Sequence, residues 1–511
     1  MVSRPTAKPR SPQPLRRGPR PLALHLASAG SAWASLRAAL PLIAADRFPW
    51  PAPLAAAAAE LRNALGAEPP EDFAAAIDRE GERRFLEFAA GVAAYRDHPY
   101  RRTLKEPPTL WQEGTTRLLD YAPRGGRPVL VVPSLVNRGH VLDLTAKTSL
   151  LRYLARRGHR PLLVDWGAPG AAERRFDLSD YIAGRLSRAL DAATEAAGGP
   201  VPVPIPVVGY CMGGNLALAL AQLREPHVAG LALLATPWDF QIDGPIKTPL
   251  DAASAAALSA AFAALDEFPV DLLQAMFASL DPFLVGRKYR AFAQSRQAGG
   301  PDAKAGGELF VALEDWVNDG VPLAAKVAAE CLVGWYGQNA PARGAWRVAG
   351  ETVTPERWRK PALLLMPQHD KIVPPACSAA LAEAMPGATA MQVASGHVAM
   401  IVGRQAEAQS WRPLADWLDG FVAAKPRAKK RPAKPRAKKR PAKPRAKKRP
   451  AKPRAKKTLA KPRAAKKSLA KTPPAKKPLT KKPIKKKLSA KVKRVPAKKS
   501  ARAKRAKKRR S

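Results

Sequence analysis

Cysteine is scarce in this chain. Cys211, Cys331 and Cys377 are the only cysteines among its 511 residues. An odd and sparse set argues against a disulfide framework and for a reducing compartment, in which thiols stay free. Each cysteine must therefore be interpreted from the residues around it.

Long apolar runs are also missing, because no stretch of 18 uncharged apolar residues occurs. We therefore expect no membrane-spanning helix. Residues 22–45 are rich in Ala and Leu and follow a Pro/Arg-rich segment, which gives them a weak likeness to a signal peptide. His25, Arg37 and Asp46 interrupt this stretch, and its apolar residues recur at helical spacing. We expect a helix here and not a cleaved leader.

Acidic and aromatic residues are absent from residues 424–511, which hold 43 of the 88 Lys and Arg residues. The other 423 residues carry 45 basic and 41 acidic residues, so the net charge of +47 belongs almost entirely to this tail. The sequence Lys-Pro-Arg-Ala-Lys-Lys-Arg-Pro-Ala occurs three times, at 425–433, 434–442 and 443–451. A segment with so little apolar surface to bury is expected to be disordered when free.

The composition of this tail predicts that it binds nucleic acid through the phosphates and without sequence preference. Its positive charges attract a phosphate backbone, and it has no aromatic side chains to stack on bases. Charge alone does not choose among polyanions, so two alternatives stay open. The tail could instead only add solubility, or it could contact anionic membranes.

The chain divides into four expected parts. These are a disordered basic N-terminus (1–20), a helical region (21–104), an α/β domain (105–422) and the disordered tail (423–511). In the α/β domain, apolar runs typical of strands alternate with helical stretches, which predicts a mostly parallel central sheet. The expected strands are Val129–Pro133, Pro161–Trp166, Pro204–Gly209, Gly230–Thr236, Pro361–Pro367 and Thr389–Ala394. The expected helices include Leu144–Arg157, Tyr181–Ala197 and Asn215–Leu223.

One interval of the α/β domain is too long for a simple crossover. More than a hundred largely helical residues separate Thr236 from Pro361. We expect an inserted helical lid over about residues 237–350. The alternative is a structural insertion that gates nothing.

The most informative motif is Val207-Val-Gly-Tyr-Cys-Met-Gly-Gly-Asn215. An apolar strand runs into Gly209-Tyr-Cys-Met-Gly213, and an Ala/Leu-rich helix follows. This pattern predicts the nucleophile elbow of an α/β-hydrolase fold, with Cys211 in place of the usual serine. Side chains at positions 209 and 213 would clash in so tight a turn. A thiolate here attacks a thioester readily and passes the acyl group on as another thioester.

The other catalytic groups of this fold follow the nucleophile in the order acid, then histidine. Asp370 ends an apolar strand, and His397 lies in a Ser-Gly-His loop after the next strand. We expect His397 to take the proton of Cys211, and Asp370 to orient or polarise the imidazole.

The oxyanion of the reaction is expected to rest on two backbone N–H groups. One belongs to Met212, at the start of the helix after the nucleophile. The second comes from the loop after Val132, from either Leu135 or Val136.

The remaining cysteines and histidines lack such a context. Cys331 and Cys377 have no glycine frame, and we interpret both as structural residues. His369 adjoins the acid but is expected to point the other way, and His25, His98, His159 and His227 belong to no motif. We assign no metal and no cofactor to the chain.

Several motifs together resemble the polyhydroxyalkanoate synthases, in order over about residues 105–415. The similar segments are Pro133–Leu144, Val164–Gly167, Gly209–Gly214, Ala235–Phe240, Trp316–Asp319, Tyr336–Asn339, His369–Asp370 and Ser395–His397. The resemblance implies an acyltransferase that polymerises 3-hydroxyacyl-CoA, with the growing chain held as a thioester on Cys211. It also implies that His397 activates the thiol, that Asp370 helps to activate the incoming 3-hydroxyl, and that Asn339 lies near the substrate channel.

The resemblance further implies a cytoplasmic protein at the surface of polyester granules, acting with a second synthase subunit or as a homodimer. The run from Ser395 to Gly403 is closer to the short, two-subunit synthases. The basic tail is not a usual part of the family. It resembles histone-like tails and also the tails of some granule-associated proteins that tether polymer granules to the nucleoid. Two other functions stay open: a depolymerase or thioesterase that uses the same triad, and a DNA-binding architectural protein with an inert domain.

Overall fold

The computed structural model describes residues 16–66, 70–198, 203–243 and 248–421. The predicted tail, with its predicted nucleic-acid binding, lies outside the described residues, as does most of the expected disordered N-terminus. The described residues all belong to one unit, Met1–Lys430. Within them, no helix is long and apolar enough to cross a membrane.

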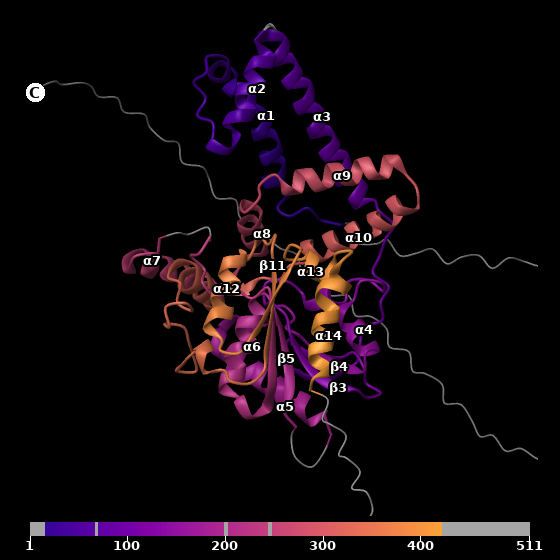
Figure 1. Ribbon diagram of the computed structural model, residues 1–511, viewed down its shortest axis with the longest axis vertical. Coiled ribbons are helices and arrows are strands. Elements are labelled where there is room, and N and C mark those ends of the chain that lie inside the picture. Colours follow the sequence, from indigo (N-terminus) through magenta and orange to yellow (C-terminus); the bar gives the residue numbers. More distant parts are fainter. Residues whose placement is uncertain (1–15, 67–69, 199–202, 244–247, 422–511) are drawn as a thin grey trace, which may run out of the picture. The chain divides into compact units, whose positions relative to one another are not determined.

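The core of the α/β domain is an eight-stranded sheet with the order β1-β2-β4-β3-β5-β6-β11-β12 (Figure 1). From β4 to β12 all neighbouring strands are parallel, and β1 and β2 add two antiparallel strands at one edge. Strands buried on both faces read as continuous apolar runs, which is the pattern seen in the sequence. The strands are β1 (Thr109–Glu113), β2 (Thr116–Asp120), β3 (Arg127–Val132), β4 (His159–Asp165), β5 (Ile205–Tyr210), β6 (Val228–Leu234), β11 (Ala362–Pro367) and β12 (Thr389–Val393).

Helices cover both faces of this sheet, and each face has its own apolar core (Figure 1). One face packs against the helical run 180–195, which ends in α5 (Ser187–Glu195), and against α6 (Met212–Leu223) and α12 (Pro375–Ala384). The other face packs against α4 (Leu150–Arg156), α13 (Ala399–Val402) and α14 (Arg412–Asp419). This is the three-layer architecture that the sequence predicts.

The insertion between β6 and β11 is mostly helical, as expected. Its helices are α7 (Ala252–Ala263), α8 (Val270–Ser279), α9 (Leu284–Ala298), α10 (Pro301–Asn318) and α11 (Ala325–Ala329), with the helical segment Glu330–Gly337 after them. Two short strand pairs were not expected from the sequence. They are β7 (Glu267–Phe268) with β8 (Leu323–Ala324), and β9 (Arg347–Val348) with β10 (Glu351–Thr352).

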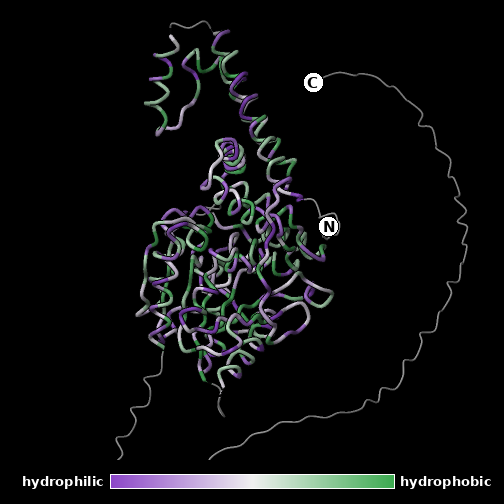
Figure 2. The backbone as a smooth tube through the Cα atoms, turned by 90° about the vertical axis from the view of Figure 1, so that its right-hand side faces the viewer, coloured by the Kyte–Doolittle hydropathy of each residue, from purple (hydrophilic) through white to green (hydrophobic). Residues whose placement is uncertain are grey.

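The N-terminal region consists of three helices, α1 (Leu22–Ala44), α2 (Ala55–Leu65) and α3 (Pro70–Arg96). Apolar and polar residues alternate along these helices (Figure 2). The C-terminal half of α3 packs against α9, where Phe88, Val92 and Tyr95 meet Tyr289 and Phe292 in a separate small core. The N-terminal region is thus joined to the insertion between β6 and β11.

One expected helix begins later than the sequence suggests. The helix expected over Leu144–Arg157 starts only at Leu150. Thr145 and Thr148 exchange two backbone hydrogen bonds in a turn before it. The Ser149 hydroxyl then caps the helix by accepting a hydrogen bond from the backbone N–H of Arg152. Serine and threonine hydroxyls form such local hydrogen bonds with the backbone in place of helical ones, so they favour the start of a helix over its interior.

Candidate active site

Cys211 occupies a sharp turn between β5 and α6. Its backbone lies at φ 55° and ψ −132°, a conformation that costs free energy for a residue with a side chain. A Cβ atom on Gly209 would overlap the backbone of Gly214, and one on Gly213 would overlap the carbonyl oxygen of Val132. The expected steric need for glycine at both positions is confirmed. The turn presents the thiol at the carboxyl end of the sheet, next to the N-terminus of α6.

Asp370 and His397 are both buried and lie together at the carboxyl end of the sheet. Asp370 follows β11, His397 follows β12, and these strands are neighbours in the sheet. The distance from His397 Nδ1 to Asp370 Oδ2 is 2.7 Å. The other carboxylate oxygen, Oδ1, accepts backbone hydrogen bonds from Ile372 and Val373, each at 2.8 Å. The carboxylate is therefore fixed by three donors, one of which is the imidazole.

The charge state of His397 is set by competing effects. Burial lowers its pKa, whereas the Coulombic interaction with Cys211 and the hydrogen bonds to Asp370 and Cys211 raise it. The net result is a pKa raised from 6.5 to about 10. Since Nδ1 contacts Asp370, Nε2 is the ring nitrogen left to interact with Cys211. This geometry allows the imidazole to accept the thiol proton and to hold it as an imidazolium beside the thiolate.

The tyrosine beside the nucleophile supports the histidine loop. The Tyr210 hydroxyl donates a hydrogen bond of 3.2 Å to the backbone carbonyl of His397. The two rings lie 5.4 Å apart. The sequence analysis missed this role, although Tyr210 stands inside the elbow motif itself.

The loop after β3 runs beside the elbow, as expected for a second oxyanion donor. Met212 is the first residue of α6, so its backbone N–H has no partner within the helix. The backbone N–H of Val136 donates a hydrogen bond of 3.1 Å to the Ser134 hydroxyl. The assignment of both N–H groups to an oxyanion hole stays a prediction, and an acyl oxygen would have to replace Ser134 at Val136.

Asn339 lies farther along the chain in a buried position with a positive φ of 54°. Its amide oxygen accepts a hydrogen bond of 3.0 Å from the backbone of Phe240, and its amide nitrogen donates one of 2.8 Å to Asp239. These contacts fix the segment that follows β6. The side chain thus has a structural task, and its predicted contact with substrate stays a prediction.

The other singled-out residues are placed as follows. Cys331 and Cys377 are buried, and burial raises the pKa of both thiols, that of Cys377 to about 12. Such thiols are poor nucleophiles at neutral pH, which agrees with a structural role. The His369 side chain is exposed, whereas the adjoining Asp370 is buried.

A pocket of about 370 Å³ lies beside β2, β4 and the short helical turn Gly139–Leu142, and Cys211, Asp370 and His397 do not line it. Three arginines line it, and each is paired with a carboxylate: Arg102 with Asp143, Arg117 with Asp165, and Arg138 with Asp319. These pairs balance the charge of the arginines that line the pocket. Among the described residues, no cluster of His, Cys, Asp and Glu side chains could hold a metal ion.

Comparison with known proteins identifies the family of this fold. The model of a protein family described as the alpha/beta hydrolase fold matches residues 127–404, more than half of the chain. The chain belongs to the α/β-hydrolase family. Within this family its relatives are poly(3-hydroxyalkanoate) polymerases, the group that the motifs indicate.

Three of these relatives are proteins named poly(3-hydroxyalkanoate) polymerase subunit PhaC. The one from Haloferax mediterranei is 26% identical over 316 residues, which cover 60% of this chain and 62% of the relative. The one from Synechocystis is 29% identical over 301 residues (57% and 77%), and the one from Allochromatium vinosum is 29% identical over 299 residues (57% and 80%). The chain therefore spans about three fifths of the length of the Haloferax relative.

Solved structures of similar fold include a thioesterase domain from the curacin biosynthetic pathway. It is 16% identical, with a TM-score of 0.38, and the match covers 62% of this chain and 100% of that domain.

Proposed function

We propose that this α/β-hydrolase family member is an acyltransferase that polymerises 3-hydroxyacyl-CoA into a polyhydroxyalkanoate through a Cys211 thioester. The single observation that carries the proposal is a thiol on the strained elbow between β5 and α6, with a buried histidine near it that Asp370 holds at 2.7 Å and whose pKa the thiol raises. A thioester intermediate conserves the reactivity of the CoA thioester, so that a further acyl transfer remains possible. The names of the relatives support the same substrate class.

In the first step, His397 removes the proton of Cys211, and the thiolate sulfur attacks the thioester carbonyl. Charge that develops on the carbonyl oxygen is stabilised by the backbone N–H groups of Met212 and Val136. The bond from carbonyl carbon to CoA sulfur breaks, and CoA leaves as the thiol with the proton that the imidazolium returns.

In the second step, the 3-hydroxyl of the next unit attacks the acyl-Cys211 thioester. Its proton passes to the imidazole of His397, an ester bond forms, and the bond to the Cys211 sulfur breaks. The Asp370 carboxylate keeps the Nδ1 proton in place, which leaves Nε2 free to accept. By the family resemblance, Asp370 also helps to activate this incoming hydroxyl.

Hydrolysis is the competing function, because a depolymerase or thioesterase would use the same groups with water as the acceptor. The experiment supplies 3-hydroxybutyryl-CoA to the full-length protein and measures both CoA release and polymer. CoA release with polymer supports the proposal, whereas CoA release with only free 3-hydroxybutyrate supports the hydrolase. The Cys211→Ala variant should lose CoA release, and retention of a tenth of the turnover would contradict the nucleophile assignment. An inert domain would release no CoA at all.

We further propose that residues 424–511 bind nucleic acid through its phosphates. The observation that favours this is the set of 43 basic residues without a single acidic one. If about 10 phosphates are neutralised together, the affinity for DNA should fall by roughly 10³–10⁵ between about 50 and 200 mM salt. Deleting the tail should abolish DNA binding and leave Cys211 chemistry unchanged. Equal DNA affinity with and without the tail would refute the proposal.

A cytoplasmic location at the surface of polyester granules, with a tail-mediated link to the nucleoid, follows from these two proposals. Whether a second subunit or a homodimer completes the enzyme is decided by the same assay. Activity of the purified chain alone, compared across protein concentrations, separates a self-sufficient enzyme from one that needs a partner.

A further inference from the structure

Two tryptophan side chains bind the backbone of the loop between β3 and the short helical turn Gly139–Leu142. The Trp166 indole N–H donates to the carbonyl of Pro133 at 3.0 Å, at the beginning of this loop. The Trp316 indole N–H donates to the carbonyl of Arg138 at 2.7 Å, near its end. An indole is a donor only, and a buried indole N–H is more stable when it has an acceptor. Each contact therefore fixes one end of the loop.

Val136, the predicted second oxyanion donor, lies between these two ends. It is three residues after Pro133 and two residues before Arg138. The beginning of the loop also touches the elbow, where a Cβ atom on Gly213 would overlap the backbone of Val132 and Pro133. A displacement of Arg138 would consequently move the Val136 N–H relative to Cys211.

A second contact reinforces the hold on Arg138. Its guanidinium Nε lies 2.9 Å from a carboxylate oxygen of Asp319, the residue that follows α10. Trp316, on the last turn of α10, and Asp319, just after the helix, contact the backbone and the side chain of the same residue, Arg138. The loop after β3 is therefore joined to the C-terminal end of α10 at two points, the carbonyl and the guanidinium of Arg138.

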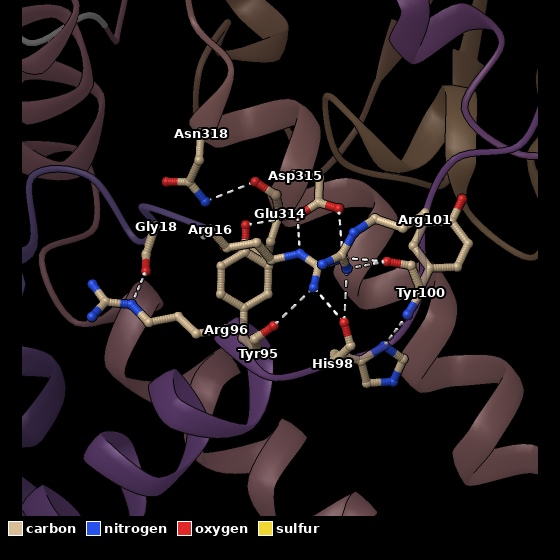
Figure 3. Close-up of polar contacts among 10 residues, drawn as sticks. All are labelled: Arg16, Gly18, Tyr95, Arg96, His98, Tyr100, Arg101, Glu314, Asp315 and Asn318. Atoms are coloured by element: carbon tan, nitrogen blue, oxygen red, sulfur yellow. Dashed lines mark hydrogen bonds and ion pairs between the residues drawn. The ribbon is translucent and has the colours of Figure 1, made fainter. Parts of the chain in front are cut away.

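The last turn of α10 is itself held from several directions (Figure 3). Asp315 accepts hydrogen bonds from the guanidinium of Arg16 and, at 2.9 Å, from the Tyr95 hydroxyl. The adjoining Glu314 is buried and pairs with Lys288 of α9 at 2.6 Å. The turn that carries Trp316 is therefore tied to the N-terminal segment, α3 and α9, and offers the loop a rigid support.

We propose that Trp316 is a positioning residue for acyl transfer, which holds the Val136 N–H in place through Arg138. This inference rests on the proposed acyl-transfer function of Cys211. Trp316 touches no reacting atom and acts through the loop. A misplacement of about 1 Å in a catalytic group is enough to cost roughly 10²-fold in rate, and loss of one oxyanion donor costs about 10²–10³-fold.

The test compares two reactions of the same thiol in Trp316→Phe, which removes the indole N–H and keeps an aromatic ring. Acylation of Cys211 by p-nitrophenyl butyrate needs both the thiolate and the oxyanion hole. Alkylation of Cys211 by iodoacetamide needs only the thiolate. We expect single-turnover acylation to fall about 10–100-fold and alkylation to stay within about twofold of wild type.

Trp358→Phe is the matched control, because Trp358 is a buried tryptophan whose indole nitrogen has no hydrogen-bond partner. It should leave both reactions unchanged. A second variant, Asp319→Asn, alters a half-exposed carboxylate and should lower acylation alone, by a smaller factor. If Trp316→Phe does not fold, the acylation and alkylation rates of Asp319→Asn test the inference instead.

An equal fall of acylation and alkylation in Trp316→Phe would show a merely structural role and overturn the inference. Unchanged acylation would overturn it as well. Because the probe is a simple ester, these outcomes hold even if the chain proves to be a hydrolase. Polymer formation from 3-hydroxybutyryl-CoA by the wild type tests the proposed function separately.

Discussion

Replacing Asp370 by asparagine isolates the role of one negative charge, because the two side chains have the same shape. Asp370 Oδ1 accepts two backbone N–H groups at 2.8 Å, and Oδ2 faces His397 Nδ1 at 2.7 Å. In the Asp370→Asn variant, one of these two positions is taken by the amide oxygen and the other by the amide NH₂. Only one of the two arrangements keeps the backbone N–H groups paired.

The energies decide which arrangement forms. If the NH₂ group faced the backbone, the N–H groups of Ile372 and Val373 would lose their acceptor inside the protein. Each buried donor left without a partner costs about 1–3 kcal/mol, so this orientation is disfavoured by about 2–6 kcal/mol. The NH₂ group therefore faces His397, and Nδ1 must become an acceptor. The imidazole proton then sits on Nε2, toward Cys211, where it prevents the ring from accepting the thiol proton.

We expect Asp370→Asn to lower the rate of Cys211 acylation by about 10³–10⁴-fold, the effect of a wrong histidine tautomer. Single-turnover acylation by 3-hydroxybutyryl-CoA measures the first step, and steady-state CoA release measures elongation. Asp416→Asn, which changes an exposed carboxylate on α14, serves as the control. Acylation within tenfold of wild type would refute the tautomer argument. Normal acylation with failed elongation would instead assign Asp370 to the incoming hydroxyl.

Three further predictions follow from charge and packing. Because the pKa of His397 is raised to about 10, the stabilisation from its protonated form is complete below about pH 6.5 and is lost as pH rises through about 10. The difference in Tm between wild type and His397→Gln should therefore shrink between about pH 6.5 and 10, and a difference independent of pH would contradict this. Gly214→Ala should distort the elbow, since the added methyl would overlap Thr236, and Cys211 alkylation should slow with little change in the far-ultraviolet circular dichroism. Arg16→Ala removes an ion-pair partner of Asp315, which is one-third exposed, and should destabilise the N-terminal helices by about 1–3 kcal/mol, seen as faster proteolysis there; unchanged proteolysis would show that the pair is dispensable.

The central strands were predictable from the sequence because they are buried on both faces. Each reads as a compact apolar run, and β3, β4, β5, β6 and β11 were expected for this reason. The sixth expected strand, β12, is also present, although it is an edge strand whose residues are mostly exposed. The edge strand β1 and its neighbour β2 were not identified, since Thr109–Glu113 is mostly exposed and Thr116–Asp120 includes Thr, Arg and Asp. Side chains at a sheet edge carry a mixed pattern that a loop can also have.

The arrangement of the candidate site was only partly predictable. Cys211, Asp370 and His397 stand in local frames of glycine and strand ends, so their neighbours in the sequence reveal them. Trp316 and Arg138 are 178 residues apart, and no local pattern indicates that an indole at one position binds a carbonyl at the other. The contact between Ser134 and Val136 was equally unpredictable. The Ser134 hydroxyl accepts a hydrogen bond from the Val136 N–H, and this bond depends on the conformation of the loop.

The ion pair between Arg16 and Asp315 also bears on how the chain is made. Asp315 follows Arg16 by 299 residues, so at about 5–20 residues per second a ribosome needs roughly 15–60 s to add it. For more than half of that interval α3 has been synthesised, but Tyr289 and Phe292, against which Phe88, Val92 and Tyr95 pack, have not. The N-terminal helices therefore expose an apolar face while the rest of the chain is still being translated. That face is a natural substrate for chaperones that act on nascent chains.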